Sequence, residues 1–182
     1  EIYDEVKSVD VIKPVVVSMG SVAASGGYYI AAPAREIIAN PGTIIGSIGV
    51  IMEFTNVQEL LDKIGLNSVV VKSGEYKDIG SPTREMTAAE RAILQDLIDD
   101  VHSQFVESVA DGRNMEQTVV RSIADGRVFS GRRAMEIGLV DKMGNLQVAI
   151  QRAAELAGVD GEPNVVYPPG TKPRFIDLFI EE

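Results

Sequence analysis

The chain contains no cysteine, which excludes several kinds of chemistry at once. Disulfide bonds, thiolate catalysis and cysteine-bound metals all require a thiol that this sequence does not supply. Tryptophan is also absent, and aromatic residues make up only 5 % of the 182 residues. Small aliphatic side chains must therefore form the core, and a hydrophobic content of 45 % is enough to build one for a single domain.

Positive charge is also scarce, because the formal net charge is −10 and the isoelectric point is about 4.6. Binding to nucleic acid requires a basic patch on the surface, so we expect no nucleic-acid partner. No apolar run approaches the roughly 18 residues of a membrane-spanning helix. One histidine and scattered carboxylates form no cluster of ligands, so we expect neither a bound metal nor a cofactor.

The most informative stretch is Gly20–Ile30, with the sequence GSVAASGGYYI. An apolar run precedes it and a helix-compatible run follows it, which predicts a strand, a tight turn and a helix. Ser25 lies at the turn, where the unpaired N–H groups of a helix N-terminus stabilise an oxyanion. Ser25 is therefore a candidate nucleophile, although small residues at such a turn can also serve packing alone.

A serine nucleophile needs a base, and the choice is narrow. The single histidine, His102, is predicted at mid-helix beside an apolar stripe, which is typical of a surface or boundary residue. Lysine remains, and Lys77 lies in a loop of Ser, Gly and Pro after an apolar run. A lysine acts as a base only if its pKa falls from about 10.4 towards 7 or 8, which burial can achieve. Ser47 could orient the neutral amine; alternatively, Lys77 is a solvated loop residue and Ser47 an ordinary turn residue.

Hydrophobic periodicity and turn residues predict alternating strands and helices along the chain. This order indicates an α/β layer fold with a largely parallel sheet. We expect N-caps at Asn114 and Ser130, and a capping box at Thr87 and Glu90. Predicted strands lie at residues 15–18, 37–39, 50–54, 68–72 and 165–167, and predicted helices at residues 1–9, 57–64, 87–111 and 145–157.

Five phrases, in this order along the chain, resemble a known family. They lie at residues 13–31, 43–51, 72–84, 124–134 and 138–141. Together they are similar to the signal peptide peptidase A family, whose members are Ser–Lys peptidases. The resemblance covers most of residues 1–160 and is closest to the shorter, single-domain bacterial type. It implies a Clp-protease/crotonase-like layered α/β fold with a mostly parallel sheet and flanking helices.

The resemblance also implies roles for individual residues. Ser25 matches the nucleophile, Lys77 the general base and Ser47 the serine that holds the lysine. Gly26 matches the position whose backbone N–H contributes to the oxyanion hole. The family's other oxyanion donor lies in a Gly-Gly segment upstream of the phrase that matches Glu1–Lys7, and this chain does not contain that segment.

The implied function is endopeptidase cleavage of signal peptides or other apolar peptides through an acyl-enzyme. The family implies a ring-like homo-oligomer, anchored in a bacterial membrane, with the catalytic domain on the extracytoplasmic side. We interpret residues 1–182 as one peptidase domain that lacks its N-terminal part and anchor, with a Pro-rich tail at residues 163–182. Residues 50–54 are the candidate edge for pairing with an extended substrate.

Two other functions remain open from the sequence. One is a crotonase-type acyl-CoA enzyme, which would stabilise an enolate with backbone N–H groups and need no serine. The other is a non-catalytic assembly module, because half of the oxyanion hole lies outside this chain. The set of Ser25, Ser47 and Lys77 favours the peptidase.

Overall fold

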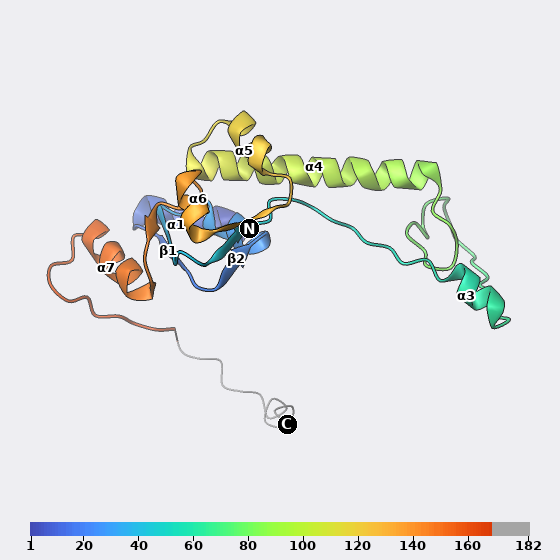
Figure 1. Ribbon diagram of the computed structural model, residues 1–182, viewed down its shortest axis with the longest axis horizontal. Coiled ribbons are helices and arrows are strands. Elements are labelled where there is room, and N and C mark those ends of the chain that lie inside the picture. Colours follow the sequence, from blue (N-terminus) through green and yellow to red (C-terminus); the bar gives the residue numbers. More distant parts are fainter. Residues whose placement is uncertain (169–182) are drawn as a thin grey trace, which may run out of the picture.

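The computed structural model describes residues 1–168, which form an α/β body and a long projecting arm (Figure 1). Residues 169–182 lie outside the described part, and with them most of the predicted Pro-rich tail. The body contains two small sheets of three strands each, with helices on both sides. The layered α/β class predicted from the sequence is confirmed.

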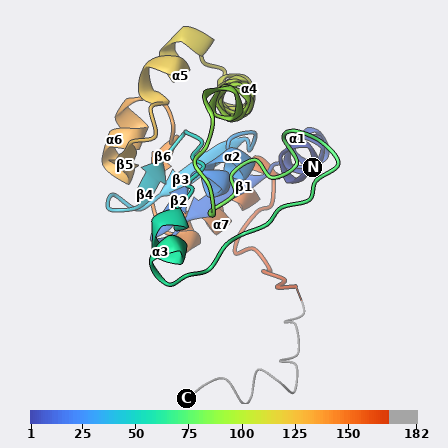
Figure 2. The ribbon, with the colours of Figure 1, turned by 90° about the vertical axis from the view of Figure 1, so that its right-hand side faces the viewer.

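The first sheet has the strand order β1-β3-β6, and all its pairs are parallel. Its strands are β1 (Val16–Met19), β3 (Glu36–Ala39) and β6 (Lys142–Met143). The central strand β3 is almost wholly buried, as expected for a parallel strand covered on both faces. Helix α7 packs below β1 and β3, while α2 and α4 lie above the sheet (Figure 2).

The second sheet has the order β2-β4-β5, with one parallel and one antiparallel pair. Its strands are β2 (Val22–Ala24), β4 (Ile44–Gly46) and β5 (Val128–Ser130). All three strands are too short to show an alternation of apolar and polar residues, so the sequence did not predict them. This sheet matters for function because Ser25 follows β2 directly and Ser47 follows β4 directly.

Seven helices complete the described part of the chain, and local caps explain several of their ends. Thr87 and Glu90 form the predicted capping box, and the side chains of Ser130 and Asn145 cap two later helices. Asn114 does not begin a helix as predicted, because its left-handed backbone ends the preceding one instead. The helices are α1 (Ile2–Ile12), α2 (Gly26–Ala31), α3 (Gln58–Lys63), α4 (Ala88–Arg113), α5 (Gln117–Ile123), α6 (Gly131–Glu136) and α7 (Leu146–Leu156).

The core joins the body to the C-terminal half of α4. It consists mainly of aliphatic side chains, as the shortage of aromatics predicted, and its largest fully buried member is Tyr28. Tyr28 donates a hydrogen bond from its hydroxyl to the carbonyl of Leu139, so its polar atom is satisfied. The buried residues of α4 that anchor it here are Phe105, Val106, Val109 and Ala110. The N-terminal half of α4 is left to carry the arm.

The arm comprises residues 50–87 and runs beside the N-terminal half of α4 (Figure 1). The predicted strands at 50–54 and 68–72 are wrong, because neither segment is a strand and both are exposed. Among residues 1–168, the backbone of residues 50–56 forms no hydrogen bond with another segment. Apolar β-branched runs of this kind form strands only where a partner strand accepts their backbone groups, and the arm offers none.

Two further observations complete the fold. The strand predicted at residues 165–167 is also wrong, since this segment has no regular structure. Within residues 1–168, none of the helices combines the length and the apolar character that crossing a bilayer would require.

Candidate active site

Ser25 occupies a sharp turn that leads into α2, as the sequence predicted, but the strand that enters the turn is β2 and not the predicted strand at 15–18. Its backbone has φ 51° and ψ −120°, a conformation that residues other than glycine rarely adopt. The turn is fixed by a hydrogen bond of 2.8 Å from the Ser25 N–H to the Gly46 carbonyl. Such strain is on the order of 1–3 kcal/mol and collects at functional sites. A serine at a strained strand-to-helix turn presents its Oγ outward, as a nucleophile requires.

Ser47 follows β4 and also has a positive φ, of 51°. Its N–H donates to the Arg127 carbonyl at 2.8 Å, which fixes it against the strand that pairs with β4. In the described part of the chain, Asn114 is the other non-glycine residue with positive φ, and it has a structural explanation as a helix cap. The positive φ of Asn114 is thus explained by helix capping, whereas the positive φ of Ser25 and of Ser47 needs another explanation.

A cavity of about 500 Å³ brings the two serines together. It lies between the turns after β2 and β4, the start of the arm and the middle of α4. Ser25 is exposed and Ser47 is half-buried, so both hydroxyls are accessible to a ligand. The lining consists of Ser25, Ser47, Gly49, Val50, Ile51, Ile98, His102, Ala124, Asp125 and Gly126.

Gly46 is the residue that allows this approach of two turns. It has φ 89°, and a Cβ at this position would lie 2.8 Å from the Phe129 ring. A side chain here would therefore clash as well as strain the backbone. Gly26, the predicted oxyanion donor, is the first residue of α2, where a backbone N–H has no partner within the helix. This N–H is adjacent to the Ser25 hydroxyl in the chain, as an oxyanion donor must be.

His102 is half-buried, as expected for a boundary residue, but sequence reasoning missed its place in this cavity. Its Nε2 lies 2.7 Å from the Ala124 carbonyl and donates a hydrogen bond to it, which leaves Nδ1 as the acceptor of the neutral ring. The spacing of apolar residues on α4 predicted which face was buried. It could not predict that Ala124, 22 residues later, would come alongside.

Lys77 is not brought to the cavity within one chain. It lies in the loop at residues 73–82, at the far end of the arm, and it is exposed (Figure 1). Arg84 connects Asp78 of this loop to Glu90 in the first turn of α4, whereas the cavity reaches α4 at Ile98 and His102. Eight residues of helix separate Glu90 from Ile98 and twelve separate it from His102, which is about 12 to 18 Å at 1.5 Å per residue.

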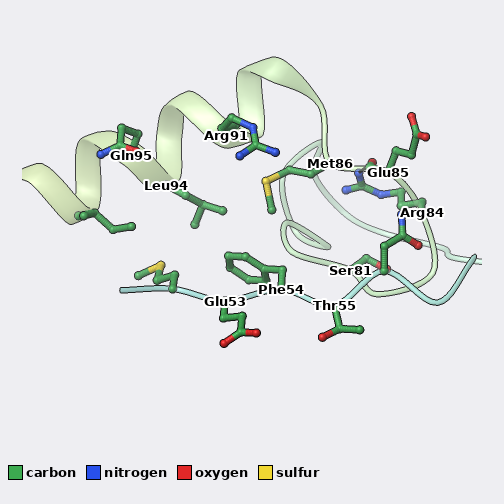
Figure 3. A pocket seen from close by; sticks show the side chains of 13 residues that line it. Glu53, Phe54, Thr55, Ser81, Arg84, Glu85, Met86, Arg91, Leu94 and Gln95 are labelled. Atoms are coloured by element: carbon green, nitrogen blue, oxygen red, sulfur yellow. Dashed lines mark hydrogen bonds between the residues drawn. The ribbon is translucent and has the colours of Figure 1, made fainter. Parts of the chain in front are cut away.

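A second cavity, of about 570 Å³, lies between the arm and α4 (Figure 3). Phe54, Met86 and Leu94 point into it, and Arg91 lies along its helical side. Ile98 lines both cavities, so the second one continues from the Ser25 cavity along the exposed segment 50–56. The two together form a path that leads away from Ser25, with apolar side chains among polar and charged ones.

Comparison with known proteins places the chain among peptidases. The sequence profile described as Peptidase family S49 matches residues 7–160. A Synechocystis sp. protein named as a protease is 51 % identical over 160 residues, which are 88 % of this chain and 58 % of that protein. An Enterococcus faecium protein named as the signal peptide peptidase SppA is 39 % identical over 80 % of this chain and 42 % of its own length. The chain thus spans about half the length of these relatives.

A solved structure shares the fold. It is a mutant of a membrane-bound, stomatin-specific protease, and it matches with a TM-score of 0.51 over 83 % of this chain and 59 % of that one. The sequence identity is 15 %, so this likeness concerns the fold alone. It agrees with the Clp-protease/crotonase-like class predicted from the sequence.

Proposed function

Because the chain belongs to peptidase family S49, we propose that it is a serine peptidase with Ser25 as the nucleophile. The observation that carries this proposal is the strained Ser25 turn, which opens on a cavity shared with Ser47. The Gly26 N–H would donate to the oxyanion of the tetrahedral intermediate. The family also disfavours the acyl-CoA alternative, whose chemistry would leave the strained serine without a role.

We propose Lys77 as the general base, supplied by a second copy of the chain. Two facts support a second copy. The arm holds the Lys77 loop about 12 to 18 Å along α4 from the cavity, and Lys77 is exposed. A lysine becomes a base only when burial favours its neutral amine. Docking of the arm against a neighbouring body would supply both the approach to Ser25 and the burial, and Ser47 would accept or donate the bond that orients the amine.

The proposed reaction proceeds through an acyl-enzyme. Neutral Lys77 takes the Ser25 proton as Oγ attacks the scissile carbonyl carbon, and the tetrahedral oxyanion forms against the Gly26 N–H. Lys77 then gives the proton to the leaving amine, and the C–N bond breaks. In the second half the same amine takes a proton from water, which attacks the ester. Collapse of that intermediate returns the proton to Ser25 Oγ and releases the acid.

Apolar peptides, including cleaved signal peptides, are the substrates we propose. The path formed by the two cavities offers apolar side chains such as Phe54, Leu94 and Ile98 between polar ones. Segment 50–56 runs along it with free backbone groups, which an extended peptide could pair with. The E. faecium relative named as a signal peptide peptidase supports this substrate class. We also propose an extracytoplasmic site at a bacterial membrane, where cleaved signal peptides are found.

A Ser25–His102 pair is the second candidate mechanism. It is favoured by one observation, which is that both residues line the same cavity in a single chain. The hydrogen bond from Nε2 to Ala124 leaves only Nδ1 to accept a proton. This mechanism would need no second copy, so the two candidates make different predictions.

The deciding experiment uses the full-length protein, a fluorophosphonate probe and an apolar peptide substrate. We expect labelling to disappear in Ser25→Ala and to fall at least 100-fold in Lys77→Ala, since general-base catalysis contributes about 10²–10⁴-fold. Lys7→Ala is the matched control, because Lys7 pairs with Asp111 away from the cavity. Labelling of Ser25→Ala at another residue would refute the nucleophile.

The base is tested separately by alkylation, because this chain has no cysteine. Lys77→Cys treated with bromoethylamine carries an amine of nearly the same length, and its sulfur makes that amine less basic. We expect activity to return, with the rising limb of kcat/KM moved to lower pH. If the limb instead lies near 6.5, the ordinary value for histidine, and vanishes in His102→Ala, the histidine mechanism is correct.

A further inference from the structure

Arg84 joins the Lys77 loop to the first turn of α4. Its Nε donates to Asp78 Oδ2 at 2.9 Å, and its Nη1 donates to Glu90 Oε2 at 2.8 Å. A further bond runs from Nη2 to Glu90 Oε1, so the contact with Glu90 uses both carboxylate oxygens. Figure 3 shows Arg84 where the loop meets the helix, close to Ser81. One guanidinium therefore holds two carboxylates from separate segments, and one of them is the neighbour of Lys77.

The same group of bonds extends on both sides of Arg84. Lys72 donates to Asp78 Oδ1 at 2.6 Å and to the Glu75 carbonyl at 2.7 Å, so the loop is tied at its start as well. Arg84 Nη2 also reaches the Asp78 carbonyl, at 3.2 Å. At the other side, Glu90 accepts from the Thr87 N–H as part of the capping box. The backbone around Lys77 is thus tied to a rigid helix end through Asp78.

Burial and charge make this connection specific. Glu90 is only 2 % exposed, and Asp78 is mostly covered. Arg84 is the main cause that lowers the pKa of Asp78, and it lowers the pKa of Glu90 to about 2. Both carboxylates are therefore charged at neutral pH. A planar fork that contacts two carboxylates fixes direction as well as distance, which an ammonium group on a flexible stem does not.

Exposed loops do not normally need such a fixed end, whereas a loop that carries a catalytic group does. We propose that Arg84 is a positioning residue for Lys77, and that it holds the loop so that the amine meets Ser25 of a neighbouring copy at a fixed distance. This inference rests on the proposed Ser–Lys mechanism. It adds a residue that does not touch the reacting atoms but sets where the base stands.

Arg84→Lys in the full-length protein is the test, because it keeps the charge but cannot contact Asp78 and Glu90 together. We expect kcat to fall about 10- to 100-fold, the loss expected when a reacting group is displaced by about 1 Å, with KM little changed. The rising limb of kcat/KM should move to higher pH, since a displaced amine is less buried. The matched control is Arg152→Lys, which disrupts a similar two-oxygen contact with Glu36 in the body. Its kcat and pH profile should stay within twofold of the wild type.

The outcomes separate positioning from a purely structural role. A kcat and a pH profile unchanged in Arg84→Lys would overturn the inference. The inference would also be overturned if activity fell only in proportion to the fraction of protein that the fluorophosphonate labels, with the pH profile unchanged. If Arg84→Lys fails to fold, Asp78→Asn replaces it and should shift the profile in the same direction. Activity that survives Lys77→Ala would instead refute the proposed base, and this result is read independently of Arg84.

Discussion

At the scale of single residues, two serines with positive φ lie beside the same cavity. Ser25 and Ser47 share φ 51°, and each is held by a backbone hydrogen bond of 2.8 Å. A glycine would relieve the strain at either position, yet each has a hydroxyl that opens on the same cavity. Their roles differ in the proposed mechanism. The Ser25 hydroxyl gives its proton to Lys77, whereas the Ser47 hydroxyl orients the Lys77 amine.

Replacement of Ser47 by alanine and by glycine separates the hydroxyl from the backbone. We expect both variants to lose about tenfold in kcat, the value of one hydrogen bond, with KM little changed. Ser47→Ala should also have a free energy of unfolding about 1 kcal/mol lower than that of Ser47→Gly, because alanine retains the strain of positive φ and glycine does not. It should therefore unfold at a lower denaturant concentration. Steady-state kinetics and urea unfolding measure the two effects. A Ser47→Gly enzyme with the kcat of the wild type would mean that the hydroxyl has no part in catalysis.

At the scale of elements, α4 connects the two functions of the chain. Its C-terminal half packs into the core through Phe105, Val106 and Val109, and its middle forms one wall of the Ser25 cavity. Its N-terminal half carries the arm, and the capping box at Thr87 and Glu90 ties that end to the Lys77 loop through Arg84. One rigid helix therefore sets the distance between the nucleophile and the loop that carries the proposed base.

The pH dependence of this helix end follows from Glu90. The hydrogen bonds from Arg84, and secondly those from Thr87, lower its pKa from 4.5 to about 2. A lowered pKa stabilises the fold above the unfolded value and loses that contribution as protons bind. We expect the arm to keep its protection from hydrogen exchange down to about pH 4.5 and to lose it progressively towards pH 2.

Glu90→Gln tests this assignment. It should open the N-terminal turns of α4 at pH 7, and its difference from the wild type should shrink as the pH falls below about 4.5. Glu107→Gln is the control on the same helix, because Glu107 is exposed and should leave the profile unchanged. A constant difference between Glu90→Gln and the wild type at all pH values would show that the charge of Glu90 does not hold the arm.

At the scale of the whole molecule, the body and the arm differ in how far their apolar residues are buried. The described core lies in the body and the C-terminal half of α4, whereas the arm exposes many apolar residues, including Leu60, Val69 and Val71. An apolar run of this kind on a projecting segment is typical of a surface that another protein covers. This distribution supports the proposal that the arm packs against a second copy.

Mixing two inactive variants tests whether the active site is shared. Ser25→Ala and Lys77→Ala are each expected to be inactive alone. Co-expressed in equal amounts, they should regain roughly a quarter of wild-type activity, because random assortment in a head-to-tail ring pairs an intact serine with an intact lysine at that frequency. Co-expression of Ser25→Ala with Ser25→Ala,Lys77→Ala is the control and should stay inactive. No recovery in the first mixture would place both residues in one chain.

The sequence by itself determined the local features of this protein. The turn and helix at Ser25, the capping box of α4 and the cap at Ser130 depend on neighbouring residues, so their pattern was sufficient to predict them, whereas the short strand β2 before Ser25 was missed. The family resemblance gave the candidate residues. It did not give the strain at Ser25 and Ser47, because backbone angles depend on the strands that hold both ends of each turn.

Only the tertiary structure decided how these features are arranged. The strands predicted at 50–54 and 68–72 failed because a strand needs a partner for its backbone, and nothing in a local pattern says whether one is present. The meeting of Ser25, Ser47 and His102 in one cavity depends on contacts far apart in the chain. The separation of Lys77 from that cavity depends on the length of α4, which turns a pair of residues predicted to act together into a site that we propose two copies must build.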